Sequence, residues 1–366
     1  MTGSLHGTRV VEFAGLGPGP FAAMLLADAG ADVVRIDRPG GAAARNALTD
    51  GRPVVRLDLK NAAGRATALE LVRRADVLIE GFRPGVMERL GLGPEVCLEE
   101  NPGLVYGRMT GWGQDGPRAR EAGHDINYLA SVGALRSIGR RGEAPVPPLN
   151  LVGDYGGGGM LLAFGLLVAL HERHVSGRGQ VVDAAMVDGV SLLMAGVWNR
   201  AAEGRWSAEP GTNDIDTGAP FYDVYRTADG EYMAVGSIEP QFYARLLDGL
   251  GLDPAMCAEQ WDRDRWPDTK AEIARAFASG TRAQWTGRFA DRDACVTPVL
   301  SMAEAPHDPH VAERGTLEGD RKAHRPAPAP RLSRTPLRRA EGPAESTADA
   351  VVHRWTASAA DLVRQS

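Results

Sequence analysis

The stretch "TRVVEFAGLGPGPFAAMLLADAGADVVRID", residues 8–37, contains the strongest local pattern of the chain. Residues 8–15 form an apolar run typical of a short buried strand, and residues 16–20 form a tight turn rich in glycine and proline. An apolar helix follows over residues 21–30 and ends at Gly30, and residues 31–37 repeat the strand pattern. The stretch therefore predicts a unit of strand, helix and parallel strand.

The same alternation continues along the chain. Apolar strand patterns occupy residues 53–59, 76–82 and 104–113, and helical patterns occupy residues 64–75 and 85–93. Strands that alternate with helices in this way form a parallel sheet covered by helices on both faces. The sequence predicts an α/β fold with a large, doubly wound, Rossmann-like domain, whose ligands bind at the carboxyl ends of its strands.

The turn "GLGPGP" at residues 15–20 partly matches the glycine fingerprint of dinucleotide-binding sites. Asp37 ends the second strand, where that fingerprint has an acidic residue for the ribose hydroxyls. Two details disfavour a nicotinamide cofactor. Pro20 stands at the third glycine position, and Arg38 adds a positive charge beside the carboxylate.

The carboxyl ends of the expected strands carry four basic residues in turn, namely Arg38, Lys60, Arg83 and Arg108. Each one alone is consistent with a solvated surface charge. Because the carboxyl ends of parallel strands meet at one edge of the sheet, the four together favour an anionic ligand with several phosphates. An acyl-CoA, which has three phosphate groups, fits this expectation.

The composition excludes several classes of protein. The chain has 366 residues with 43% hydrophobic side chains, enough for a sizeable core, and its 41 basic and 47 acidic residues give no basic face for nucleic acid. The amino terminus lacks a secretory signal pattern, and the apolar run at residues 159–170 is too short to span a bilayer. Three scattered cysteines indicate no disulfide framework. We expect a cytoplasmic protein without a membrane span.

The pattern changes beyond residue 186, which indicates a second, smaller α+β domain. We expect the large domain at residues 1–186, a linker at 187–221 and the small domain at 222–307, with a hairpin turn at 228–230. A return linker then covers 308–328, in a region that becomes rich in proline, alanine and arginine. A carboxyl-terminal segment, 329–366, is expected to pack back on the large domain.

Three titratable residues lie at predicted helix starts. His124 precedes a helical pattern in "GHDINYLAS", Asp154 lies just before the glycines of "GDYGGGGMLLAF", and Glu239 precedes Pro240 in "SIEPQFY". Each carboxylate could simply cap its helix, and the dipole of the long helix favours the ionised form of Asp154. Gly156 to Gly159 permit either close helix packing or the approach of a ligand. The pairs "HERH" at 171–174 and "HDPH" at 307–310 lack a third ligand, so we expect no metal site.

Several long motifs resemble the family III CoA-transferase superfamily. They are "VVEFAGLGPGPFAAMLLADAGADVVRIDRP", "DVLIEGFRPGVMERLGLG", "MTGWGQDGPRAREAGHDINYLA", "LNLVGDYGGGGM" and "SGRGQVVDAAMVDG". The "GHDINY" and "IEPQFY" segments are similar to the alpha-methylacyl-CoA racemases of that superfamily. The resemblance runs nearly from end to end and implies an interlocked homodimer that binds an acyl-CoA thioester.

The resemblance also implies roles for individual residues. It assigns the two central acid–base groups to His124 and Asp154, with Glu239 and Asn150 around them. It assigns CoA or substrate contacts to a larger set: Arg38, Leu57, Asp58, Leu59, Lys60, Gly81, Phe82, Arg83, Arg89, Gly123, Asp125, Ile126, Asn127 and Tyr128. Three of the four cations noted above, Arg38, Lys60 and Arg83, belong to this set.

The implied reaction is the inversion of the carbon next to the thioester carbonyl of a 2-methylacyl-CoA. Inversion removes a proton from one face and returns one to the other, so it requires two acid–base groups. Histidine titrates near neutrality, whereas Asp154 needs a raised pKa that opposes the helix dipole. A backbone N–H at the helix start, notably that of Asp125, suits the enolate oxygen. The thioester carbonyl takes the electron pair, so no cofactor beyond CoA is expected.

The alternative within the same superfamily is a CoA-transferase. In that reaction the aspartate that matches Asp154 attacks the thioester as a covalent nucleophile, and CoA passes to another acid. The fold and the CoA contacts would be the same. His124 and Glu239 favour the racemase, because the transferases usually have other residues there.

Overall fold

The computed structural model describes residues 3–40, 47–320 and 323–363, and the chain divides into two compact units. Unit 1 comprises Met1–Val132, Pro148–Met194 and Glu318–Ser366, and unit 2 comprises Gly133–Pro147 and Ala195–Leu317. The units differ from the expected boundaries, because unit 1 extends to Met194 and resumes at Glu318, unit 2 begins at Ala195, and residues 133–147 also group with unit 2. Within unit 2, the Arg140 guanidinium of this segment forms an ion pair of 2.8 Å with the buried Asp223 carboxylate.

The expected linkers also contain regular structure. Helices α7 (Met186–Leu193) and α8 (Ala195–Ala202) lie within or across the predicted 187–221 linker. The predicted return linker contains helix α12 (Pro309–Arg314) and a two-stranded sheet of β10 (Leu317–Asp320) and β11 (Ala323–Pro326). Helix α12 is capped by the Asp308 carboxylate, which accepts from the backbone N–H of Val311 at 3.0 Å.

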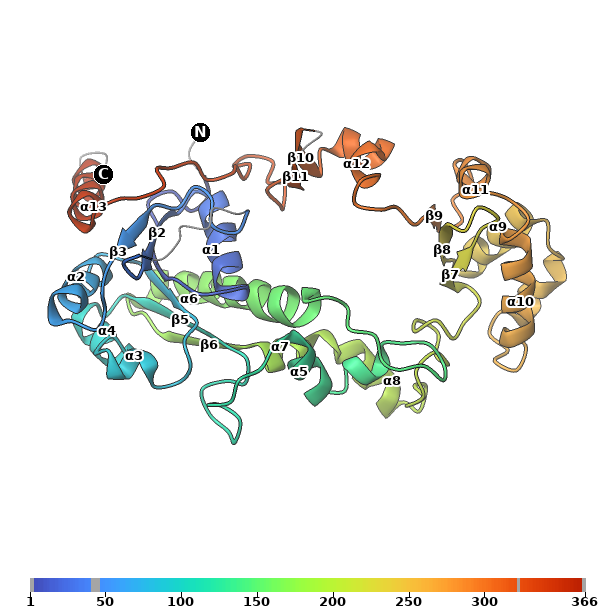
Figure 1. Ribbon diagram of the computed structural model, residues 1–366, viewed down its shortest axis with the longest axis horizontal. Helices are drawn as coiled ribbons and strands as arrows, with labels where there is room; N and C mark the ends of the chain where they lie inside the picture. The colour runs from blue at the N-terminus through green and yellow to red at the C-terminus, as the bar shows by residue number, and fades with distance from the viewer. Residues whose placement is uncertain (1–2, 41–46, 321–322, 364–366) are drawn as a thin grey trace. The chain divides into compact units, whose positions relative to one another are not determined.

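Unit 1 is built on a six-stranded parallel sheet with the order β3-β2-β1-β4-β5-β6 (Figure 1). The strands are β1 (Arg9–Phe13), β2 (Asp32–Asp37), β3 (Val54–Arg56), β4 (Val77–Glu80), β5 (Val105–Thr110) and β6 (Val181–Ala185). The order reverses between β1 and β4, which is the switch point where open α/β sheets bind ligands. The predicted doubly wound, Rossmann-like α/β fold is confirmed.

Helices cover both faces of this sheet. They are α1 (Pro18–Asp28), α2 (Ala62–Val72), α3 (Val86–Arg89), α4 (Pro94–Glu100), α5 (Asp125–Ser131), α6 (Leu161–Ser176), α7 and the carboxyl-terminal α13 (Ala348–Val363). A ten-residue π-helix, η2 (Leu151–Met160), leads directly into α6. Helix α4 was missed by the sequence analysis, which assigned no helix to residues 94–100.

Alternate residues of the central strands β1, β2, β4 and β5 contribute to two separate hydrophobic cores. Val10 of β1 packs with residues of α1 and α6, such as Leu26 and Leu166, on one face. Its neighbour Val11 packs with residues of α2 and α13, such as Leu71, on the other. The carboxyl-terminal helix is also held by an ion pair of 2.7 Å between Arg354 and Asp32. These contacts attach α13 to the amino-terminal end of β2 in unit 1.

The segment Leu151–Ser176 forms one helix that is long and apolar enough to cross a membrane, judged by length and composition only. The sequence analysis judged residues 159–170 too short to span a bilayer, but the helical segment that contains them is longer than that apolar run. The core helix of a soluble protein passes the same test. Here Leu162, Ala163, Leu166 and Ala169 are buried in the core that α6 shares with the sheet.

Unit 2 contains a three-stranded antiparallel sheet of β7 (Tyr222–Arg226), β8 (Tyr232–Gly236) and β9 (Val296–Pro298). The expected hairpin turn lies between β7 and β8, and Gly230 within it has a φ of 84°. Helices α9 (Pro240–Leu250), α10 (Trp266–Phe277) and α11 (Arg282–Phe289) pack on the sheet around a core rich in aromatic rings. Shorter 3₁₀ segments are η1 (Leu135–Ser137), η3 (Pro254–Glu259) and η4 (Ala305–His307).

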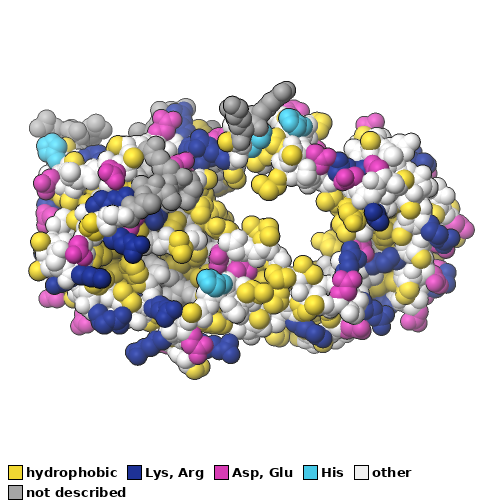
Figure 2. All heavy atoms as spheres, in the orientation of Figure 1, with side chains coloured by type: hydrophobic (Ala, Val, Ile, Leu, Met, Phe, Trp, Pro, Cys, Tyr) yellow, Lys and Arg dark blue, Asp and Glu magenta, His cyan; other side chains and the backbone are white. Residues whose placement is uncertain are grey.

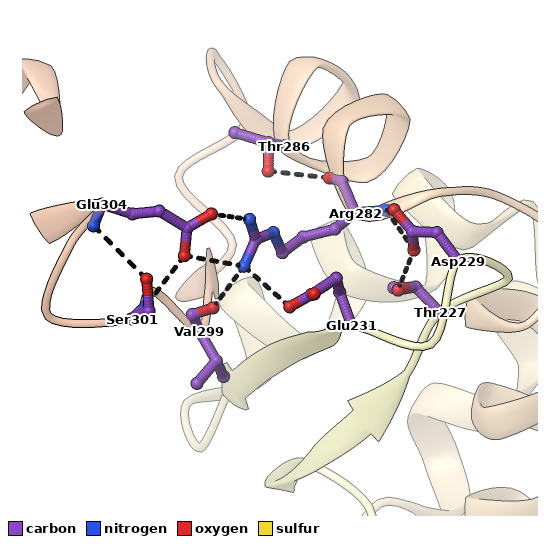
Figure 3. Close-up of polar contacts among 8 residues, drawn as sticks. All are labelled: Thr227, Asp229, Glu231, Arg282, Thr286, Val299, Ser301 and Glu304. Atoms are coloured by element: carbon purple, nitrogen blue, oxygen red, sulfur yellow. Dashed lines mark hydrogen bonds and ion pairs between the residues drawn. The ribbon is translucent and has the colours of Figure 1, made fainter.

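Arg282, at the start of α11, connects the hairpin of unit 2 to the segment after β9 (Figure 3). Its guanidinium donates to the Val299 carbonyl at 2.8 Å, to Glu231 at 3.0 Å and to both oxygens of Glu304. The hydrogen bond from Arg282 is the main reason why the pKa of the Glu304 carboxyl falls to about 2. Bonds from Ser301 add to this decrease.

We expect the Arg282→Ala variant to lose part of the acid resistance of unit 2. The depressed pKa of Glu304 means that its contribution to stability is present above about pH 4.5, the ordinary value, and is lost as pH falls toward 2. Without Arg282 the Glu304 titration should move back up, so the variant should unfold at higher pH than the parent. Acid unfolding followed by tryptophan fluorescence checks this. Arg275→Ala on α10, an exposed arginine of the same unit with no acidic partner among the described contacts, is the control.

Candidate active site

A cavity of about 250 Å³ opens at the carboxyl ends of β1, β4 and β5 in unit 1. Its floor includes Phe13, Ile79 and Met109, each at or near the end of a strand. Two of the proposed acid–base residues, His124 and Asp154, line the same cavity. Further lining residues come from the predicted contact set, namely Gly81, Phe82, Arg83, Gly123 and Tyr128.

His124 is held at the amino-terminal end of α5. It is the residue immediately before the helix, with extended backbone angles, and its backbone N–H donates to the Asn127 side-chain oxygen at 3.0 Å. The imidazole is exposed. The sequence analysis placed His124 at the start of a helix, and the structure places it directly before the first helical residue, Asp125.

Asp154 lies in the first turn of η2, and its carboxylate accepts a hydrogen bond from the Asn150 amide at 3.1 Å. Burial raises the pKa of this carboxyl above its usual range, and the nearby charge of Asp125 adds to the increase. The Asn150 amide and the charge of His124 act in the opposite direction. The net increase is the direction that an acid–base residue needs near neutral pH.

The glycine turn between β1 and α1 lies against Asp154. Gly17 has a φ of 61°, and a Cβ added to it would lie 3.5 Å from the Asp154 carboxylate oxygen. The turn that partly matched a dinucleotide fingerprint therefore forms a wall beside the proposed acid–base residue. The sequence contained this signal in "GLGPGP", but it did not indicate which residue the turn would face.

The glycines of η2 are required by helix packing. A Cβ on Gly157 would lie 2.8 Å from the Val190 backbone nitrogen in α7, and one on Gly159 would lie 2.6 Å from the Phe21 ring in α1. Gly158 is similarly close to Met186 and Pro18. Of the two alternatives left open by the sequence, close packing holds at these three positions.

A second cavity of about 540 Å³ lies at the carboxyl end of β2 and contains the other group of predicted contact residues. These are Arg38, Leu57, Asp58, Leu59, Lys60 and Phe82. The two cavities share Phe13, Gly15, Leu16 and Phe82 as lining residues. They therefore adjoin each other and could accept one elongated ligand.

The prediction that Arg108 is one of the ligand-binding cations at the strand ends is wrong. It lies inside β5 and is buried, where its guanidinium forms ion pairs with Glu80 at 3.0 Å and Glu88 at 2.9 Å. Burial raises the pKa of Glu80 to about 7, and Glu80 also accepts from the backbone N–H of Phe82 at 2.7 Å. Arg108 is therefore committed to holding the loop after β4 and is not free for a phosphate.

Other predicted residues are distributed differently. Arg89 is exposed at the end of α3 and lines neither cavity, although its guanidinium lies near Gly85. Ile126 and Asn127 are exposed on α5, whereas Asp125 is buried. Glu239 precedes α9 in unit 2 and is exposed. Within the described parts of the chain, no three His, Cys, Asp or Glu side chains gather as metal ligands.

Several lining residues were singled out by neither the cation pattern nor the motifs, among them Trp112 and Thr110. Trp112 packs edge-on against Tyr128, with ring centroids 4.8 Å apart, and lines the cavity beside His124. Thr110 ends β5 and lines the cavity. No sequence pattern marked it, because a buried threonine in a strand is common. Thr110 reaches the cavity because it ends β5, and Trp112 because it lies in the loop directly after that strand.

The sheet order and the adjoining cavities at its switch point define an α/β protein with an elongated ligand site. A model of the family described as "CoA-transferase family III" matches residues 5–349, and the chain belongs to that family. The alpha-methylacyl-CoA racemase of Mus musculus is 51% identical over 333 residues, which cover 91% of this chain and 87% of that protein. The alpha-methylacyl-CoA racemase of Homo sapiens is 50% identical over 334 residues, with 91% and 87% covered.

Solved structures agree with the fold. A CaiB/BaiF family protein from Brucella suis aligns over 97% of this chain and 100% of its own, with a TM-score of 0.81 and 23% sequence identity. At that identity the likeness concerns the fold alone.

Proposed function

We propose that this protein is a 2-methylacyl-CoA epimerase, which interconverts the (R) and (S) thioesters through an enolate. The observation that carries the proposal is that His124 and Asp154, from separate segments, line one cavity at the switch point of the sheet. The similarity to alpha-methylacyl-CoA racemases at about half of all aligned positions supports the choice of substrate class.

The CoA moiety would occupy the cavity at the end of β2. Arg38 and Lys60 are exposed cations at its edge and suit the phosphates, while Leu57 and Leu59 offer apolar surface for the adenine. The wall shared by both cavities would then lie along the pantetheine, and Arg83 would adjoin it from the other cavity. The reaction needs no cofactor beyond the CoA of the substrate, because the thioester carbonyl itself accepts the electron pair.

The proton transfer uses both titratable groups. One of them, as a neutral imidazole or a carboxylate, removes the α-proton, and the C–H electron pair moves to the carbonyl oxygen to form the enolate. The other group, protonated beforehand, donates its proton to the opposite face of the carbon. The raised pKa of Asp154 favours its protonated state and so suits the donor role.

The enolate oxygen requires a hydrogen-bond donor. Asp125 is the first residue of α5, so its backbone N–H is one of those that have no acceptor within the helix. In other enzymes the loss of one such donor costs about 3 to 4 kcal/mol of transition-state stabilisation. We assign the Asp125 N–H to this role.

We also propose a homodimer in the cytoplasm. Large apolar side chains are exposed on neighbouring elements of unit 1, including Phe164 on α6 at 65% and Leu192 on α7 at 63%. Hydrophobic side chains are visible among polar ones over the α5 and α7 region in Figure 2. Exposed apolar surface of this kind is typical of a subunit interface. Sedimentation of the purified protein tests the dimer.

The experiment that tests the function is proton NMR of the protein with (S)-2-methylacyl-CoA in D₂O, with and without a free carboxylic acid. Loss of the α-proton signal and appearance of the other epimer, independent of the acid, is the expected result. If the α-proton persists and a new thioester forms only with the acid, the protein is a CoA-transferase and Asp154 is its nucleophile.

Replacement of Glu239 by glutamine should lower turnover without weakening CoA binding. The family resemblance implies that Glu239 lies around His124, and a carboxylate that accepts from a histidine base fixes its tautomer and increases its basicity. We expect its loss to reduce kcat about tenfold or more. Steady-state kinetics and CoA inhibition constants check this. A large loss of CoA affinity with unchanged kcat would instead assign Glu239 to ligand binding.

A further inference from the structure

The side chain of Asp125 makes contacts that the proposed reaction does not yet use. It is 4% exposed, and one carboxylate oxygen, Oδ2, accepts from the backbone N–H of Gly153 at 2.6 Å and of Asp154 at 2.8 Å. The other oxygen, Oδ1, is buried without a hydrogen-bond partner among the described residues. Burying a carboxylate lowers stability unless its oxygens are hydrogen-bonded, and here one oxygen is unpaired. The position therefore calls for a functional explanation.

These bonds connect two segments that are distant in sequence. Asp125 begins α5 directly after His124, and Gly153 and Asp154 lie in the first turn of η2. The first N–H groups of a helix have no acceptor inside it, and Asp125 supplies one from another helix. The connection therefore joins the backbones on which both proposed acid–base residues are carried.

Gly153 makes this close approach possible. A Cβ at that position would lie 2.7 Å from the Asp125 carboxylate oxygen and 3.1 Å from a methyl carbon of Leu129. Any larger residue would push the carboxylate away from both N–H groups. Glycine at residue 153 and aspartate at residue 125 therefore act as a matched pair.

The same contact affects the charge at Asp154. The N–H groups that would stabilise an ionised Asp154 at the helix start are directed instead at Asp125, while the Asp154 carboxylate accepts from the Asn150 amide. The titratable groups that act on Asp154 are Asp125, whose charge raises its pKa, and His124, whose charge lowers it. The conflict between the helix dipole and a protonated Asp154 is thereby reduced.

We propose that Asp125 is a positioning residue whose carboxylate binds the start of η2 to the start of α5 and so holds Asp154 and His124 at a fixed separation. The inference rests on the proposed epimerase function for its catalytic consequence. Its structural part, the restraint on the Gly153 and Asp154 amides, can be measured without any substrate.

The first test is hydrogen exchange of the full-length protein in the parent, Asp125→Asn and Asp125→Ala forms. Hydrogen bonds to a charged acceptor correspond to about a 10- to 100-fold effect on an equilibrium, so amides of residues 151–156 should exchange faster by that factor in Asp125→Ala. Amides of 161–176 should be unchanged. Asp115→Asn, an exposed carboxylate on the loop after β5, is the matched control.

The second test follows the Asp154 carboxyl by ¹³C NMR and the α-proton exchange of each epimer. In Asp125→Asn we expect the Asp154 titration to move to lower pH and kcat to fall about tenfold or more, with KM within about threefold of the parent. The asparagine keeps the size of the side chain and tests the charge even where the alanine variant does not fold.

Unchanged amide exchange in both variants would overturn the proposal, as would a loss of activity matched by an equal loss of folded protein with no shift in the Asp154 titration. Failure of the parent protein to exchange the α-proton would contradict the epimerase function, but it would leave the amide result as a separate finding.

Discussion

In D₂O, the His124→Ala variant should still exchange the α-proton of one epimer of a 2-methylacyl-CoA, while exchange from the other epimer falls by about 100- to 10,000-fold. In the proposed mechanism each face of the α-carbon has its own base, so loss of the imidazole should disable one face only. Inversion needs both groups, and epimer interconversion should therefore be lost in both directions. Proton NMR of each pure epimer, recorded separately, measures the two exchange rates.

The control for this experiment is His174→Ala. That histidine is exposed near the end of α6 and lines neither cavity. It should leave both exchange rates at the parent level. Equal loss of exchange from the two epimers in His124→Ala would contradict the assignment of one base to each face.

The Asp154→Asn variant should show the opposite preference between the two epimers. Exchange should be lost from the epimer that His124→Ala still processes and retained from the other, again with a difference of about 100- to 10,000-fold. Asparagine keeps the shape of the side chain and an oxygen that accepts from Asn150, and it leaves the backbone bonds to Asp125 intact. The change therefore removes the proton-transfer group with little disturbance of η2.

The same variant separates the two candidate chemistries. An epimerase without Asp154 still exchanges one face, whereas a transferase without its nucleophile loses thioester transfer and had no α-proton exchange to begin with. Retention of full exchange from both epimers in Asp154→Asn would remove this residue from the mechanism. Tight binding of CoA to the variant, measured by calorimetry, verifies that the site is still formed.

Local patterns predicted much of unit 1. The strand, helix and strand at residues 8–37 are β1, α1 and β2, because their apolar runs and turn residues agree with the packing on both faces of the sheet. The positions after β2, β3 and β4 predicted the cavity residues Arg38, Lys60 and Arg83, since parallel strands end at one edge.

Other features depend on contacts between distant residues and could not be predicted. Arg108 was expected at a ligand, but Glu80 from the neighbouring strand and Glu88 from α3 neutralise it inside the protein. Likewise, Asp125 was identified only through its backbone, because its acceptor role depends on Gly153 and Asp154 in another helix. Local sequence patterns contain no information on which distant residues these side chains contact.

The wall formed by Phe13, Gly15, Leu16 and Phe82 belongs to both cavities, and the Phe82 amide is tied through Glu80 to the interior of the sheet. If the nucleotide end of a thioester is held on one side of such a rigid partition, the carbon to be inverted arrives at a set distance on the other. Acyl groups that differ only beyond that carbon would reach the same pair of proton carriers. Because the CoA part is the same in every substrate, binding through it would allow acyl chains of many lengths. The geometry at the inverted carbon would stay the same for all of them.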